Sequence, residues 1–202
     1  MLVGEKIKVK SLGLRDYEAT LEAMREFTRR RDAATPDEFW LLEHPPVYTL
    51  GLAAAPQDPG NGIPVVKTER GGEITYHGPG QVVLYTLVDL ARRGIKVKQF
   101  VWMLEQSVID LLGSRGTRRA GAPGIYVGEA KVAALGIRVS RGCAFHGVAL
   151  NVDMDLTPFS AIDPCGYPGL AVTQTRDLGI EGDVDSLGGK LAKLLAARLS
   201  DA

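Results

Sequence analysis

Apolar residues recur every three or four positions in three stretches of the chain, a spacing that places them on one face of an α-helix. The first stretch ends in the cations of residues 29–31, which complement the dipole at a helix C-terminus. The other two stretches cover residues 97–112 and 184–199. We therefore predict three amphipathic helices. The apolar positions of the first are Leu14, Tyr17, Leu21, Met24 and Phe27.

Short apolar or alternating runs between turn residues predict strands. Segments 53–64 and 153–170 are rich in proline, glycine or acidic residues without a clear period, and they are predicted to be loops. Adjacent strands with a few separated helices favour an α/β or α+β fold with mixed sheets flanked by helices, not regular βαβ winding. The predicted strands are 6–10, 39–42, 47–50, 65–68, 73–77, 82–90, 124–127, 132–140 and 144–152.

The composition is that of an ordinary globular protein. The 202 residues are 45% hydrophobic, and no linker divides them, so we expect one domain over residues 1–202. The 24 basic and 24 acidic residues give a net charge of zero, and nothing global attracts the chain to nucleic acid or to a membrane. The N-terminus lacks the pattern of a signal peptide, and no apolar run reaches the ~18 residues of a membrane span, so a cytoplasmic location is expected.

Two glycine-rich turns bracket a short alternating strand in the segment 69–81, ERGGEITYHGPGQ. Glycines permit close backbone approach, so this layout favours a ligand that lies against main chain. A plain hairpin without a ligand is the alternative. The segment has neither the Walker spacing nor GxGxxG, which argues against a phosphate-binding loop.

Cys165 lies in a turn flanked by proline and glycine, where a thiol is either a nucleophile or an inert loop residue. A nucleophilic thiol needs a base, and the candidates are His44, His77, His146 and the lysines. A histidine pKa starts near neutrality and needs no tuning, so the residues alone favour histidine. Lys131 is the best lysine, because the apolar run 132–135 beside it predicts burial, although such lysines often extend to solvent.

The second cysteine, Cys143, lies in an alternating strand-like run and is predicted to be packed instead of reactive. Two cysteines are too few for a disulfide scaffold, and in a reducing compartment they should be free thiols. Their spacing and the scattered histidines match none of the usual ligand patterns, so no metal site is predicted.

Three blocks of sequence together closely resemble the lipoyl(octanoyl) transferases, the octanoyl-acyl-carrier-protein:protein octanoyltransferases of lipoate biosynthesis. The blocks are RGGEITYHGPGQ (70–81), KVAALGIRVSRGCAFHGVALNVDMDLTPF (131–159) and IDPCGYPGL (162–170). They follow in the family's order and spacing, and a weaker match extends from about Leu12 to Asp177. The resemblance implies a fold similar to the catalytic domains of biotin and lipoate protein ligases.

The resemblance also implies roles for residues and partners. Cys165 matches the nucleophile that forms an acyl-thioester, and Lys131 matches the lysine that lowers the pKa of this thiol, in place of the histidine favoured above. The donor would be octanoyl-acyl carrier protein. The acceptors would be lipoyl domains of 2-oxoacid dehydrogenase E2 subunits and the glycine-cleavage H protein. The segments that match the acyl-substrate pocket contain Arg70, Gly71, Gly72, Glu73, Ile74, Thr75, Tyr76, His77, Ala134, Leu135, Gly136, Gly147, Val148 and Ala149.

A thioester donor already carries the activation that the transfer needs, so no ATP or other cofactor is expected. Three alternatives stay open: an ATP-dependent lipoate or biotin ligase, a cysteine hydrolase and a non-catalytic acyl-binding module. Because acyl carrier proteins are acidic, a basic docking face is expected. Candidate cations are Arg92, Arg93, Lys96 and Lys98, and a second group of Arg115, Arg118 and Arg119.

Overall fold

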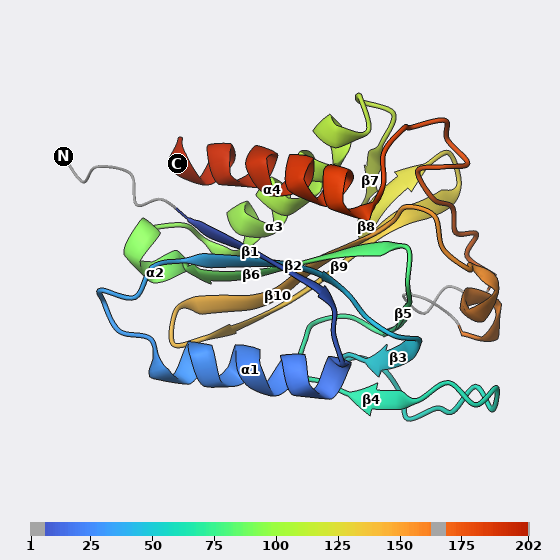
Figure 1. The fold of residues 1–202 in the computed structure, drawn as a ribbon, viewed down its shortest axis with the longest axis horizontal. Coiled ribbons are helices and arrows are strands. Elements are labelled where there is room, and N and C mark those ends of the chain that lie inside the picture. Colours follow the sequence, from blue (N-terminus) through green and yellow to red (C-terminus); the bar gives the residue numbers. More distant parts are fainter. Residues whose placement is uncertain (1–6, 163–168, 202) are drawn as a thin grey trace.

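A seven-stranded sheet runs through the computed structural model, which describes residues 7–162 and 169–201 (Figure 1). The strand order is β1-β2-β6-β10-β9-β8-β7, and neighbours are antiparallel except for β1 and β2, which are parallel. The bounds are β1 Lys8–Leu14, β2 Glu38–Glu43, β6 Gln81–Asp89, β7 Thr117–Arg119, β8 Ala122–Val127, β9 Ala130–Ser140 and β10 Cys143–Asn151.

A second, smaller sheet lies beside one face of the first (Figure 1). Its strands are β3 Val47–Leu50, β4 Val65–Lys67 and β5 Ile74–His77, in the order β4-β3-β5. Strand β3 pairs parallel with β4 and antiparallel with β5. The segment 53–64 joins β3 to β4 without helix or strand, as predicted.

Helices cover both faces of the large sheet (Figure 1). Helix α1 (Tyr17–Arg30) packs on the same face as the small sheet and buries Tyr17, Leu21 and Met24. Helices α3 (Val97–Leu111) and α4 (Val184–Ser200) pack together on the opposite face. Short helices α2 (Leu90–Arg93) and η1 (Thr157–Ala161) complete the described elements.

The fold confirms the expected mixed α/β class, with two differences in detail. Leu14 ends β1 and is 57% exposed, so it is not the first residue of the helix face. Helix α1 begins later because the Asp16 carboxylate accepts a hydrogen bond from the N–H of Ala19, at 2.8 Å, and caps the first turn. Strand β7 and helix α2 were not predicted, because three or four residues are too few to show a period.

Candidate active site

A pocket lies between the large sheet and the small sheet and encloses about 730 Å³ including its open mouth. Its walls come mainly from β5, β9 and β10, with α1 and the segments around residues 123, 159 and 172. Most of the lining is apolar, as a pocket for a hydrocarbon chain requires. The lining residues that the family resemblance had assigned to the acyl pocket are Arg70, Glu73, Ile74, Thr75, His77, Ala134, Leu135, Gly136, Gly147, Val148 and Ala149.

Three residues assigned to the pocket by resemblance do not line it. Tyr76 is 3% exposed and packs instead against Phe159, with ring centroids 5.4 Å apart. Gly71 and Gly72 are not among the residues that line the pocket. The N–H of Gly71 donates to the Ile137 carbonyl at 3.0 Å, so this turn fastens the glycine-rich segment to β9.

Two glycines on neighbouring strands allow close main-chain approach, Gly136 to the glycine-rich segment and Gly147 to strand β6. Gly136 on β9 is paired with Gly147 on β10. A Cβ at Gly147 would lie 2.1 Å from the Leu84 carbonyl oxygen, and one at Gly136 would lie 2.9 Å from the Gly71 carbonyl oxygen. Neither position has room for a side chain, so the pocket wall here consists of main chain.

Lys131 lies in the pocket wall near the start of β9 and is 4% exposed. Its Nζ donates to the Pro123 carbonyl at 3.1 Å and lies 5.2 Å from the centre of the Tyr126 ring. The side chain is therefore directed into the protein, as the apolar run beside it predicted, and does not extend to solvent.

Cys165 lies outside the described residues, which resume at Gly169. The segment that follows it is attached to β9. The Lys131 N–H donates to the Ala171 carbonyl at 2.8 Å, and the Thr173 N–H donates to the Lys131 carbonyl at 2.9 Å. Ile162, three residues before Cys165, is buried in a cluster with Ile74 and other side chains of the pocket wall.

A hydrogen-bonded chain of side chains connects the two sides of the pocket. His77 on β5 bonds through Nδ1 to the Gln81 side-chain oxygen at 2.7 Å. The Gln81 amide donates to the side-chain oxygen of Asn151 at 3.0 Å, and the Asn151 amide donates to the Thr173 carbonyl, also at 3.0 Å. Asn151 also lines the pocket, so this chain sets the position of β5 relative to the segment beside Lys131.

Arg70 and Glu69 hold the start of the glycine-rich segment. The Arg70 guanidinium donates to the Thr49 carbonyl at 2.6 Å and to the Gly71 carbonyl at 3.0 Å. The Glu69 carboxylate accepts two hydrogen bonds from Arg25 of α1, at 2.9 and 2.6 Å. Arg70 thus lines the pocket and also ties its wall to the small sheet.

The chain's three histidines are buried near one another on the α1 side of the large sheet. Burial lowers the pKa of His44 to about 4 and lowers the pKa values of His77 and His146 to about 3. All three are therefore neutral at physiological pH. Of the three, His77 and His146 line the pocket.

Sequence reasoning missed several pocket residues. Tyr17 on α1 and Tyr85 on β6 carry no local signal, because their place in the pocket depends on how α1 packs on the sheet. Asn151, Phe159 and Val172 fall within or beside the family motifs, and that position was the only available signal.

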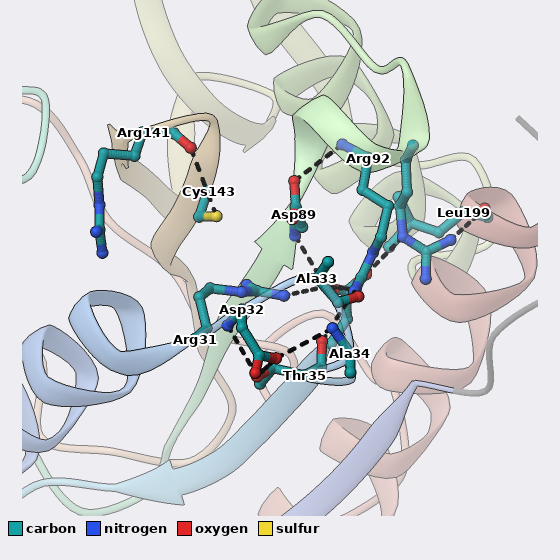
Figure 2. A network of polar contacts seen from close by, with 12 residues as sticks. Arg31, Asp32, Ala33, Ala34, Thr35, Asp89, Arg92, Arg141, Cys143 and Leu199 are labelled. Carbon is teal, nitrogen blue, oxygen red and sulfur yellow. Dashed lines mark hydrogen bonds and ion pairs between the residues drawn. The ribbon is translucent and has the colours of Figure 1, made fainter.

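Cys143, the other cysteine, is buried, and burial raises the pKa of its thiol. Its S–H is directed toward the Arg141 carbonyl at 3.8 Å (Figure 2). The expectation of a packed, unreactive thiol at this position agrees with its surroundings.

Arg92 and Arg93 do not form the free basic face that the sequence suggested. Both donate to the fully buried carboxylate of Asp37, at 2.9 and 2.6 Å, as does Arg31 at 2.6 Å. Figure 2 shows Arg31 and Arg92 in this network. Burial by itself would raise the pKa of Asp37, but hydrogen bonds from the Asp89 N–H and the arginines outweigh it and lower the pKa. These arginines stabilise the fold.

Among residues 7–162 and 169–201, no group of three or more histidine, cysteine, aspartate or glutamate side chains is placed to hold a metal ion. In the same part of the chain, no helix has both the length and the apolarity needed to cross a membrane.

Comparison with known proteins agrees with this geometry. The family model described as lipoyl protein ligase A/B catalytic domain matches residues 16–191. An octanoyltransferase from Dechloromonas aromatica (strain RCB) is 57% identical over 196 residues, which cover 95% of this chain and 96% of that protein. The chain belongs to the octanoyltransferase family. As an octanoyltransferase, it is an acyltransferase that moves octanoyl groups in lipoate biosynthesis.

Solved structures with the same architecture include ligases of low sequence identity. A bi-partite lipoate protein ligase from Thermoplasma acidophilum has a TM-score of 0.71 and 15% identity, over 97% of this chain and 92% of that chain. A biotin protein ligase from Aquifex aeolicus has a TM-score of 0.59 and 11% identity, over 95% of this chain and 70% of that chain. The octanoyltransferase therefore shares the fold expected from its sequence.

Proposed function

We propose that this octanoyltransferase works through an acyl-enzyme formed on Cys165, with Lys131 as the base. The Cys165 sulfur attacks the thioester carbonyl of the donor while its proton passes to the Lys131 amine. The tetrahedral intermediate collapses, the carrier thiolate leaves, and it takes the proton back from Lys131. Cys165 then carries the octanoyl group as a new thioester.

In the second half, the ε-amine of an acceptor lysine attacks the Cys165 thioester. An amide bond forms, the C–S bond breaks, and Lys131 accepts the proton that the amine loses and returns it to the Cys165 sulfur. No bond in either half requires an external source of energy, because a thioester is exchanged for a thioester and then for a more stable amide.

The observation that carries this proposal is the burial of Lys131 in the wall of an apolar pocket, beside the segment that follows Cys165. Ile162 precedes Cys165 by three positions in the sequence. Ile162 packs against the pocket wall. Described residues before and after Cys165, Ile162 and Ala171, therefore contact elements of the pocket wall, which supports the proposal.

The apolar part of the pocket is proposed to hold the octanoyl chain. Among the described residues, this part of the pocket has no side-chain hydrogen-bond donors. It is formed by the side chains of Ile74, Leu135 and Ala149 and by the main chain of Gly136 and Gly147. Burying apolar surface contributes roughly 25 cal/mol per Å² to the free energy of binding. The octanoyl chain therefore contributes much of the donor's affinity.

The partners we propose are octanoyl-acyl carrier protein as donor, and as acceptors the lipoyl domains of 2-oxoacid dehydrogenase E2 subunits and the glycine-cleavage H protein. The lipoate ligase from Thermoplasma acidophilum described above was studied with its E2 lipoyl domain, which supports a lipoyl domain as the acceptor for the shared fold. Residues 1–202 are proposed to act as one catalytic domain. A cytoplasmic location would keep Cys165 a reduced thiol.

The proposal is tested by incubating the enzyme with octanoyl-acyl carrier protein and a lipoyl domain, without ATP. The wild type should add one octanoyl group to the acceptor lysine, and Cys165→Ser and Lys131→Ala should lose at least 100-fold in rate. Cys143→Ser is the matched control and should retain transfer. Full activity of Cys165→Ser would contradict the proposal.

The same assay separates the alternatives. An ATP-dependent ligase would use free octanoate with ATP and would not need Cys165. A cysteine hydrolase would release free octanoate when no acceptor domain is present. A binding module would hold the donor without any turnover.

A further inference from the structure

Five rings gather in and beside the pocket, and we name them the polar ring cluster: Tyr17, His44, His77, Tyr85 and His146. Four of them line the pocket, and His44 lies behind. A pocket for a saturated hydrocarbon gains nothing from polar groups in its wall, so each member needs an explanation.

His44 and His77 are explained by their hydrogen bonds. The Nδ1–H of His44 donates to the Arg15 carbonyl at 2.7 Å, and its Nε2 accepts from the Tyr85 hydroxyl at 2.8 Å. His77 bonds to Gln81 as described above. These two histidines connect α1, β5 and β6.

His146 is different from the other two. It is 1% exposed, it lines the pocket, and neither of its ring nitrogens has a hydrogen-bond partner in the part of the chain that the structure describes. Its φ is +63°, a left-handed conformation that is uncommon for residues other than glycine, although histidine, asparagine and aspartate adopt it more often than the rest. An unsatisfied buried imidazole on a strained backbone costs free energy, which points to a role in function.

The position of His146 along the sheet suggests what that role is. His146 on β10 is paired with Ile137 on β9, six residues after Lys131. Six residues of strand span roughly 20 Å, so Lys131 and His146 lie at well-separated positions along the sheet.

We propose that His146 is a specificity-determining residue that closes the far end of the pocket and sets the longest acyl chain that the enzyme accepts. This inference rests on the proposed function, because it places the reacting thioester at Lys131 and the methyl end at His146. A longer chain would press methylene groups against ring nitrogens that need hydrogen-bond partners. The ring cannot easily turn aside, since it is stacked on Phe145 at 5.0 Å and lies edge-on to Tyr85 at 6.0 Å.

The test compares kcat/KM for octanoyl, decanoyl and dodecanoyl donors on the same carrier protein. His146→Gly opens the far end, and glycine adopts a φ of +63° without strain, so this variant should fold. We expect its dodecanoyl-to-octanoyl ratio of kcat/KM to rise at least tenfold over that of the wild type. Asparagine also tolerates this φ, so His146→Asn should fold. Its shorter amide should raise the decanoyl-to-octanoyl ratio of kcat/KM more than the dodecanoyl-to-octanoyl ratio.

Val83→Ala is the matched control, because Val83 lines the side of the pocket, on β6 opposite Ala149. This substitution removes side-chain volume from the pocket wall without opening the end at His146. It should change the dodecanoyl-to-octanoyl ratio of kcat/KM less than threefold. An unchanged ratio in His146→Gly, or an equal rise in Val83→Ala, would overturn the inference. Failure of Cys165 to become acylated by any donor would instead contradict the proposed function.

Discussion

Lys131 owes its position to a residue that has no side chain. Gly124 on β8 has a φ of +141°, and a Cβ there would lie 2.8 Å from the Lys131 Cε and 3.1 Å from its Nζ. The space that glycine leaves is occupied by the lysine, whose Nζ then reaches the Pro123 carbonyl. Gly124 is therefore a positioning residue for the proposed base.

We predict that Gly124→Ala displaces the Lys131 amine and lowers kcat for octanoyl transfer at least tenfold, with a smaller change in KM. Some loss of stability, on the order of 1 kcal/mol or more, is expected from backbone strain and from the Ala133 carbonyl oxygen, which lies 2.8 Å from the added Cβ. Gly128→Ala in the turn between β8 and β9 is the control, because it has a φ of +57° but nothing within 4 Å of its added Cβ. Equal losses of kcat in both variants would show that strain, not Lys131, is responsible.

At the residue scale, the sequence alone indicated the buried lysine but not its neighbours. An apolar run beside Lys131 predicted burial, and the lysine is buried. The roles of the histidines could not be predicted, because the burial that lowers their pKa values depends on how separate parts of the chain pack together. Cys165, on which the proposed chemistry depends, stays a prediction.

At the element scale, the short helix α2 anchors neighbouring parts of the fold. Arg93 donates to Asp37 at 2.6 Å and to the Leu199 carbonyl of α4 at 3.1 Å, and its side chain is 14% exposed. These contacts join α2 and α4 to the segment before β2. The sequence showed only a run of cations, because the buried carboxylate that they share lies more than fifty residues earlier.

We predict that Arg93→Glu lowers the free energy of unfolding by about 3 kcal/mol, because it places a carboxylate beside the buried Asp37 carboxylate. Urea unfolding would measure this change. The variant should affect kcat/KM equally for the carrier-linked donor and for a small octanoyl thioester.

Arg115→Glu is the matched comparison, because Arg115 is an exposed arginine of the second basic group. Its stability should change by less than about 1 kcal/mol. If Arg115 contacts the acidic carrier protein, this variant should raise KM for the carrier-linked donor alone. A selective rise in Arg93→Glu instead would restore the docking role of α2.

The order of elements was largely predictable, but their assembly around the pocket was not. Strand β3 was predicted with its observed bounds, because prolines precede it and a proline- and glycine-rich loop follows it. Mixed sheets were predicted, but which strands form the small sheet was not, since its β3–β4 pair is parallel and closes across the loop 53–64. Tertiary pairing of this kind leaves no period in the sequence.

At the scale of the whole molecule, the buried histidines should make stability depend on pH. Their pKa values of about 3 to 4 lie below the unfolded value of 6.5, so between these limits the unfolded chain binds more protons than the folded one. The contribution of the neutral histidines to the free energy of unfolding is therefore fully present above about pH 6.5. It is lost as the pH falls toward 4. Each histidine contributes up to about 1.4 kcal/mol per pH unit in that window.

We therefore predict that the free energy of unfolding is nearly constant from pH 7.5 to 8.5 and falls by several kcal/mol between pH 6.5 and pH 5. Urea unfolding at fixed pH values measures this slope. His146→Asn removes one titrating ring and should flatten the slope by about one third. A wild-type stability that is the same at pH 5 and pH 7.5 would show that the histidines are not buried and neutral.

The covalent step on Cys165 is the central claim, and the intact mass of the enzyme tests it most directly. The enzyme is mixed with octanoyl-acyl carrier protein in the absence of acceptor, and the acylated peptide is then mapped. The account predicts one added octanoyl group, located on Cys165, which disappears when a lipoyl domain is added. An enzyme that stays unmodified while it transfers octanoyl groups, or an adduct on Cys143, would contradict it.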